Sequence, residues 1–163
     1  MIKFSKHNIL ESDYLLVKKI MKSGWLTHGP YTKIFEEEFK KYTRSKYAVC
    51  VSSCTAGLHL SCIALNFKKG DEIIVTSTTH TATAHSIEYT GATPIFVDVD
   101  FPSGNIKVSE IKKKITKKTK GIIIVHMAGQ PCDIDKIQKL CKQYRISLIE
   151  DCAHALGSEF RKK

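Results

Sequence analysis

The fold of this chain is decided by residues 121–150, which read GIIIVHMAGQPCDIDKIQKLCKQYRISLIE. The first six residues are apolar almost throughout and rich in isoleucine, which predicts a strand covered on both faces. An apolar stripe at helical spacing then predicts an amphipathic helix: Ile134, Ile137, Leu140, Cys141 and Tyr144. A second strand is expected at 146–150. Two strands joined by a helix form a βαβ unit, so the two strands are expected to be parallel.

The same alternation of strand-like apolar runs and helical apolar stripes extends toward the N-terminus. Further strands are predicted at 47–52, 72–77 and 94–99, and helices are predicted at 56–66 and around the repeat of Val108, Ile111 and Ile115. The first 45 residues lack this alternation and instead predict two short amphipathic helices around a loop at 24–30. We therefore expect an α/β protein with an N-terminal helical segment, residues 1–45, and a domain with a mainly parallel sheet, residues 46–163.

Composition excludes several classes of protein. The chain has 163 residues, of which 42% are hydrophobic and 26% are charged, a balance that excludes a disordered or collagen-like chain. No apolar run approaches the roughly 20 residues that a membrane span needs, and no signal peptide is evident at the N-terminus. We expect a cytoplasmic protein with no membrane partner.

The net charge of +10 suggests nucleic-acid binding, because basic surfaces release counterions from phosphate backbones. However, the excess is almost entirely lysine, with only three arginines, whereas base readout favours arginine. No nucleic-acid partner is therefore expected, and the lysines at 112–120 are interpreted as a solvated face. The six cysteines form no C-x-x-C pair and are interpreted as reduced core residues, and the scattered histidines predict no metal site.

Polar residues follow the predicted strands, where α/β sheets bind ligands. The turn at 52–57 leads into a helix and either binds a phosphate or is simply a capped turn. His80, after the second strand, is either a cap or a functional residue. Asp151 lies at the tip of the last strand, with Glu150 directed to the opposite side of the sheet. Its carboxylate either pairs with a cationic cofactor ring or caps the following turn, from which His154 also projects.

Together these segments resemble the DegT/DnrJ/StrS family of pyridoxal-phosphate-dependent sugar aminotransferases. The motifs that carry the resemblance are 24–30 (GWLTHGP), 52–59 (SSCTAGLH), 69–74 (KGDEII), 89–94 (YTGATP), 125–135 (VHMAGQPCDID) and 149–155 (IEDCAHA). The resemblance implies part of the three-layer αβα large domain of fold type I, as in aspartate aminotransferase. It also implies a pyridoxal 5'-phosphate cofactor, a nucleotide-linked keto sugar and an amino-acid donor such as glutamate as substrates, and a homodimer.

The resemblance also implies roles for individual residues. Thr55, Ala56 and Gly57 match the turn that holds the cofactor phosphate. Asp151 matches the carboxylate that keeps the pyridine nitrogen protonated. His154 matches the position beside the phenolic oxygen of the ring.

Two further positions match by the same resemblance. His80 occupies the place of the aromatic residue that stacks on the ring, where relatives more often have Trp, Phe or Tyr. Trp25 and Thr27 match a loop near the sugar-nucleotide entrance.

No catalytic residue is assigned within the chain, because the family's Schiff-base lysine is expected beyond residue 163. The leading hypothesis is therefore the N-terminal part of a sugar aminotransferase engaged in amino-sugar biosynthesis. One alternative is a non-catalytic truncated paralogue that binds phosphate or pyridoxal phosphate, or that dimerises. Another is an unrelated flavodoxin-like nucleotide binder.

Overall fold

The computed structural model describes residues 7–161, which divide into two compact units, one ending at Cys50 and one beginning at Val51. The division expected at residues 45 and 46 lies a few residues before this point. Residues 1–6 and 162–163, which belong to the two expected domains, lie outside the described residues. Each unit is described by itself below.

The first unit contains two helices, α1 (Glu11–Lys22) and α2 (Pro30–Thr43). The carboxylate of Asp13 accepts a hydrogen bond from the Leu10 N–H at 2.8 Å, which satisfies one of the free donors at the start of α1. Helix α2 begins with Pro30, whose fixed backbone angle suits the first helical position. Neither helix buries a residue among those described, so the apolar stripes of both are exposed within this unit.

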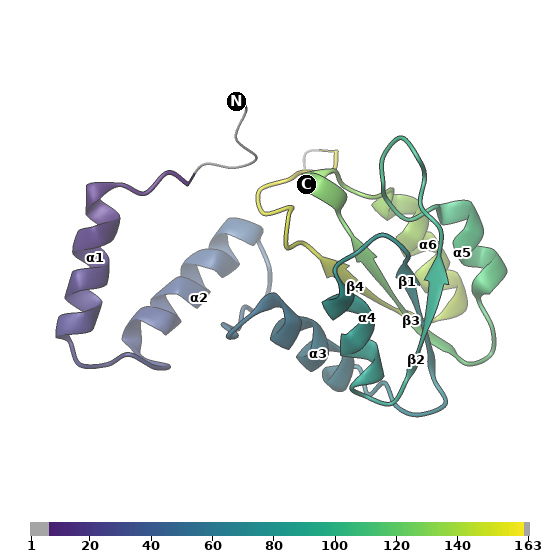
Figure 1. The fold of residues 1–163 in the computed structure, drawn as a ribbon, viewed down its shortest axis with the longest axis horizontal. Helices are drawn as coiled ribbons and strands as arrows, with labels where there is room; N and C mark the ends of the chain where they lie inside the picture. The colour runs from purple at the N-terminus through teal and green to yellow at the C-terminus, as the bar shows by residue number, and fades with distance from the viewer. Residues whose placement is uncertain (1–6, 162–163) are drawn as a thin grey trace. The chain divides into compact units, whose positions relative to one another are not determined.

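The second unit is built on a four-stranded parallel sheet with strand order β2-β1-β3-β4 (Figure 1). The strands are β1 (Glu72–Thr76), β2 (Thr93–Val97), β3 (Thr119–Val125) and β4 (Ser147–Asp151). All four lie within two residues of predicted strands. The long apolar strand β3 occupies a central position, as expected for a strand covered on both faces.

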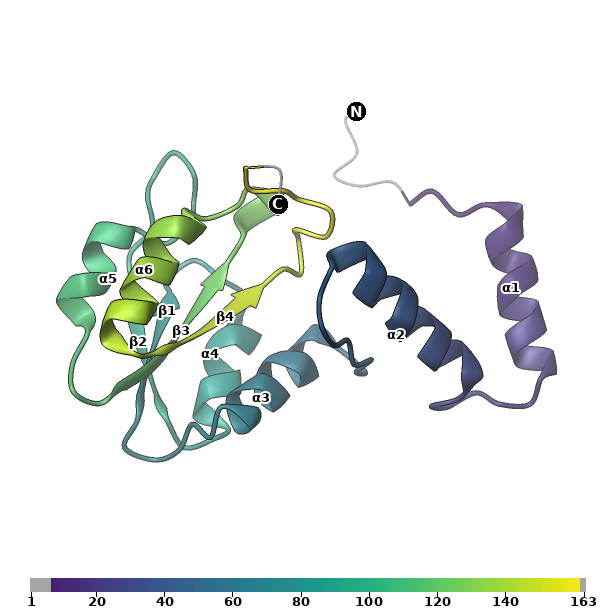
Figure 2. The ribbon, with the colours of Figure 1, turned by 180° about the vertical axis from the view of Figure 1, so that it is seen from behind.

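Helices cover both faces of this sheet. Helices α3 (Cys54–Ala64) and α4 (Thr81–Glu88) lie on one face, and α5 (Val108–Lys114) and α6 (Ile134–Tyr144) lie on the other (Figures 1 and 2). A short 3-10 turn, η1 (Met127–Gly129), follows β3. The expected three-layer αβα arrangement with a parallel sheet is confirmed.

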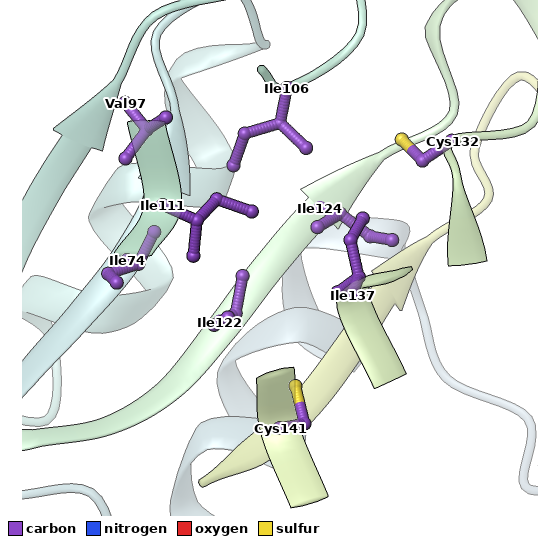
Figure 3. Close-up of a cluster of buried hydrophobic side chains, with 9 residues drawn as sticks. All are labelled: Ile74, Val97, Ile106, Ile111, Ile122, Ile124, Cys132, Ile137 and Cys141. Carbon is purple, nitrogen blue, oxygen red and sulfur yellow. The ribbon is translucent and has the colours of Figure 1, made fainter. Parts of the chain in front are cut away.

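Alternation along the strands divides the core into two clusters. Ile73, Val75 and Ile123 pack with α3 and α4, whereas the next residues along the same strands, including Ile74 and Ile124, pack with α5 and α6 (Figure 3). Full burial of each such side chain stabilises the fold by about 1.5–3 kcal/mol. Apolar packing therefore covers both faces of the sheet and holds the strands whose ends carry the candidate site residues.

The structure differs from the sequence prediction in two elements. The strand predicted at 47–52 does not form, and Tyr47 and Val49 there remain 74% and 79% exposed. Its apolar alternation is typical of a strand, but an extended segment needs a neighbouring strand for its hydrogen bonds, and no described residue pairs with it. Helix α4 is not delimited by the sequence pattern, because its sequence TATAHSIE contains few strong helix formers.

Candidate functional site

Asp151 is the last residue of β4 and is buried, with 6% of its surface exposed. On the preceding residues of the strand, Leu148 packs with the α5–α6 cluster and Ile149 with the α3–α4 cluster. Alternation therefore turns Asp151 toward α3 and α4, and turns Glu150 toward the opposite face. The predicted separation of the two carboxylates is confirmed.

Three donors from separate parts of the chain hold the Asp151 carboxylate. The Thr83 hydroxyl of α4 donates to Oδ2 at 3.2 Å. The Cys54 thiol of α3 donates to Oδ1 at 3.6 Å, and the backbone N–H of Ala153 donates to the same oxygen at 3.1 Å. Because Cys54 and Thr83 both lie in the first turns of their helices, the starts of α3 and α4 meet at this carboxylate.

The start of α3 combines a hydroxyl cap with free backbone donors. Ser53 Oγ accepts from the Ala56 N–H at 3.1 Å, and the Ser53 carbonyl accepts from the Gly57 N–H at 3.1 Å. Within residues 7–161, the N–H groups of Cys54 and Thr55 have no hydrogen-bond acceptor. The two alternatives for this turn are therefore compatible, since a capped turn still leaves N–H groups that can bind a phosphate.

His80 is the N-cap residue of α4. Its Nδ1 accepts a hydrogen bond from the Ala82 N–H at 3.2 Å, so the ring is held against the helix start and its other nitrogen stays available. The predicted cap role is thus present in the structure. Stacking of the ring on a cofactor is compatible with this cap and stays a prediction.

The remaining predicted residues are not drawn into this constellation. His154 is exposed on the turn after β4 and, within the described chain, forms no hydrogen bond to Asp151 or His80. Trp25 and Thr27 belong to the first unit. The Trp25 ring lies over Gly29, where an added Cβ would come within 2.5 Å of the ring, so a larger residue at this position would displace the ring.

Sequence reasoning missed two residues of this site, Thr83 and Cys54. Although Cys54 as a residue is exposed, partial burial of its thiol raises the pKa of that group, and the neighbouring charge of Asp151 raises this pKa further. The thiol therefore stays protonated and donates to the carboxylate. The position of Thr83, one helical turn after His80, places it near the site. Its bond to Asp151 could not be predicted, because the two residues are 68 positions apart in the sequence and no local pattern connects them.

On the other face, Glu150 belongs to a separate polar group. Its carboxylate lies 3.1 Å from His126 Nε2, and His126 Nδ1 accepts from the Cys132 N–H at 3.1 Å. Because Nδ1 is an acceptor here, Nε2 carries the proton that is donated to Glu150. His126 and Glu150 line a hollow of about 290 Å³ beside α6.

The six cysteines are all free, but they occupy different environments. Cys62, Cys132 and Cys141 are buried, as expected of core residues, whereas Cys54 and Cys152 are exposed. Among residues 7–161, no three His, Cys, Asp or Glu side chains are grouped so that they could hold a metal ion. Across the same residues, no helix has the length and apolar character needed to span a membrane.

Comparison with known proteins finds relatives of similar sequence. GDP-perosamine synthase of Escherichia coli O157:H7 is 44% identical over 154 residues, covering 94% of this chain and 42% of the relative. The uncharacterized protein MJ1066 of Methanocaldococcus jannaschii is 51% identical over 143 residues, covering 88% of this chain and 37% of the relative. The chain thus spans about two fifths of the length of these relatives.

Solved structures agree with this similarity. A GDP-4-keto-6-deoxymannose-3-dehydratase with a trapped PLP-glutamate geminal diamine superposes with a TM-score of 0.93 at 33% identity, covering 99% of this chain and 43% of the other. The PMP form of the putative sugar aminotransferase Spr1654 from Streptococcus pneumoniae gives a TM-score of 0.90 at 36% identity, with coverage of 96% and 43%. The sequence profile of the DegT/DnrJ/EryC1/StrS aminotransferase family matches residues 8–163, and the chain belongs to this family.

Proposed function

We propose that this chain forms the cofactor-binding part of a pyridoxal-phosphate-dependent aminotransferase. Its substrate would be a keto group on a nucleotide-linked sugar, with glutamate as the amino donor. The observation that carries the proposal is the buried Asp151 carboxylate, which the first turns of α3 and α4 hold at the end of β4. Family membership and the similarity to a GDP-perosamine synthase support the same assignment.

The residues present fit pyridoxal phosphate at both ends of that molecule. Its phosphate needs backbone donors, and the N–H groups of Cys54 and Thr55 have no other acceptor among the described residues. Its ring nitrogen needs an anion, and Asp151 provides one. Cys54 connects the two ends of this site, because it directly precedes Thr55 in the phosphate turn and also donates to Asp151.

We assign the following roles to the residues of this chain. When bound, pyridoxal phosphate supplies the electron sink for transamination. Asp151 holds the proton on the ring nitrogen, and the turn of Thr55, Ala56 and Gly57 binds the phosphate. His80 covers one face of the ring and excludes water there.

Three further roles belong to the same proposal. His154 donates a hydrogen bond to the phenolic oxygen of the cofactor. Trp25 and Thr27 contact the sugar nucleotide. In this proposal the Schiff-base lysine lies outside residues 1–163. Among the described residues, no lysine forms a hydrogen bond with Asp151 or the phosphate turn.

We also propose that the enzyme is a homodimer. The apolar stripes of α1 and α2 support this, because residues such as Leu15, Leu16 and Phe35 stay exposed within the first unit. Exposed apolar stripes of this kind usually mark a protein interface.

A dehydratase is the second candidate function, favoured by the structural match to the 3-dehydratase. Dehydration removes a hydroxyl group from the sugar as water, whereas transamination keeps every hydroxyl group and replaces the keto oxygen with an amino group. Incubation of the full-length enzyme with glutamate and a keto-sugar nucleotide, followed by mass spectrometry of the sugar, separates the two reactions. If neither product forms with any keto-sugar nucleotide tried, a non-catalytic binding module is favoured.

The first test of the proposal uses the purified chain. We expect it to bind pyridoxal phosphate weakly and reversibly, because the phosphate turn and Asp151 are present without the lysine. Absorbance titration measures the affinity, and borohydride reduction followed by intact mass measures covalent attachment. A stoichiometric adduct at one lysine within residues 1–163 would refute the placement of the Schiff-base lysine.

A further inference from the structure

Thr83 is fully buried, with 0% of its surface exposed, yet its side chain ends in a polar group that forms two hydrogen bonds. Its Oγ1 lies 3.2 Å from Asp151 Oδ2 and 2.7 Å from Thr79 Oγ1. An ionised carboxylate can only accept, so Thr83 must donate its single hydroxyl proton to Asp151. Thr79 must then donate to Thr83, and the direction of both bonds is fixed.

The backbone around Thr83 is held as firmly as its hydroxyl. Its N–H donates to the His80 carbonyl at 3.0 Å, and its carbonyl accepts from Ser86 Oγ at 2.8 Å. The side chain therefore has little freedom to turn away from Asp151. A valine has the same shape, so packing alone would not require a hydroxyl at this position.

The acceptor sites of Asp151 can be counted. Each carboxylate oxygen offers two, and Oδ1 already accepts from the Cys54 thiol and the Ala153 N–H. Among residues 7–161, Oδ2 accepts from Thr83 alone, which leaves one site on this oxygen for a further N–H donor. Thr83 therefore bonds to the oxygen that remains available for a ligand.

We propose that Thr83, with Thr79 behind it, is a positioning residue that orients the Asp151 carboxylate toward a protonated ring nitrogen. This inference rests on the proposed function. Its effect is exerted through Asp151, and Thr83 itself does not contact the ligand.

The test compares two ligands on the purified chain. One is pyridoxal phosphate, and the other is its analogue in which a carbon–hydrogen group replaces the ring nitrogen. Recognition by Asp151 should give wild-type protein a preference of about tenfold for pyridoxal phosphate, as expected for a charge-assisted hydrogen bond. Thr83→Val should remove most of this preference by weakening pyridoxal phosphate alone, and Thr83→Ser should retain it.

Thr119→Val is the matched control. Thr119 is a buried threonine like Thr83, and its hydroxyl accepts from the Thr116 N–H at 2.9 Å. However, it is the first residue of β3 and lies at the end of the sheet opposite to Asp151. This variant should bind both ligands like the wild type. Thr79→Val should lower the preference by about twofold to threefold and serves as the test if Thr83→Val does not fold.

The outcomes separate the two proposals. If Thr83→Val weakens both ligands equally, or neither, Thr83 is a packing residue and the inference is wrong. If wild-type protein binds the two ligands equally or binds neither, Asp151 does not recognise a ring nitrogen and the proposed function itself fails.

Discussion

The two edges of the sheet carry opposite kinds of polar surface. At the carboxyl edge, where the strands end, Asp151 and Thr83 are buried and bonded to each other. At the amino edge, where the strands begin, residues 112–120 contain six lysines and no acidic residue, and all six lysines are exposed. The first edge has few charges with many partners, and the second has many charges with few partners.

The amino edge has a structural explanation that needs no ligand. Helices α5 and α6 both end there, and Lys112, Lys113 and Lys114 form the last turn of α5. Cations are favourable beside the partial negative charge of a helix C-terminus. A hollow of about 540 Å³ lies nearby between Lys117, Lys120 and Arg145, and none of these three forms an ion pair within residues 7–161. Burial and mutual hydrogen bonding, rather than density of charge, therefore distinguish the candidate site.

The largest effect is expected from Asp151→Asn in the full-length enzyme. Asparagine keeps the volume and most hydrogen bonds but removes the charge that holds the proton on the ring nitrogen. We expect the single-turnover rate of transamination to fall by about 100-fold or more.

Glu150→Gln is the control for this change, since Glu150 lies on the same strand but faces His126 on the opposite side of the sheet. A glutamine oxygen can still accept from His126, so the rate should change little. Equal losses in the two variants, or unfolding of Asp151→Asn, would show that Asp151 is a structural cap and would remove the contrast between the two edges.

Much of this site was predictable, for physical reasons that differ from residue to residue. The isoleucine run of β3 and the stripe of α6 are local patterns, so the βαβ unit could be predicted, and with it the place of Asp151 at a strand tip. The structure of residues 47–52 could not be predicted, because their alternating pattern is typical of a strand but a strand forms only beside a partner strand. Cys54 lies 97 residues from Asp151 in sequence, and such long-range contacts exist only once the sheet has formed.

A smaller effect is expected on the chemistry of Cys54. Burial and the charge of Asp151 raise the pKa of its thiol, which lowers the fraction of reactive thiolate at neutral pH. Asp151→Asn removes that charge and should lower the pKa, so iodoacetamide should alkylate Cys54 about threefold to tenfold faster at pH 7.5. Peptide mass mapping measures this rate.

Glu150→Gln, which leaves Asp151 in place, should not change the alkylation rate of Cys54. The wild-type rate should also fall when pyridoxal phosphate is added, because Cys54 belongs to the phosphate turn. If neither Asp151→Asn nor added cofactor changes the alkylation rate of Cys54, its thiol lies outside the site.

The smallest effect is expected at the amino edge, from the double variant Lys117→Gln and Lys120→Gln. These side chains repel their neighbours and have no ion-pair partner within the described residues, so neutralising them should stabilise the fold by up to about 0.5 kcal/mol at low salt. The gain should vanish near 0.5 M salt, because exposed charges are screened over a few ångströms there. Urea unfolding at two salt concentrations measures this gain in stability.

Affinity of the same variant for pyridoxal phosphate should stay within about twofold of wild type, since the site lies at the other end of the strands. A marked loss of cofactor affinity in this variant would mean that the lysines contribute to the site, and that the two edges do not divide structure from function.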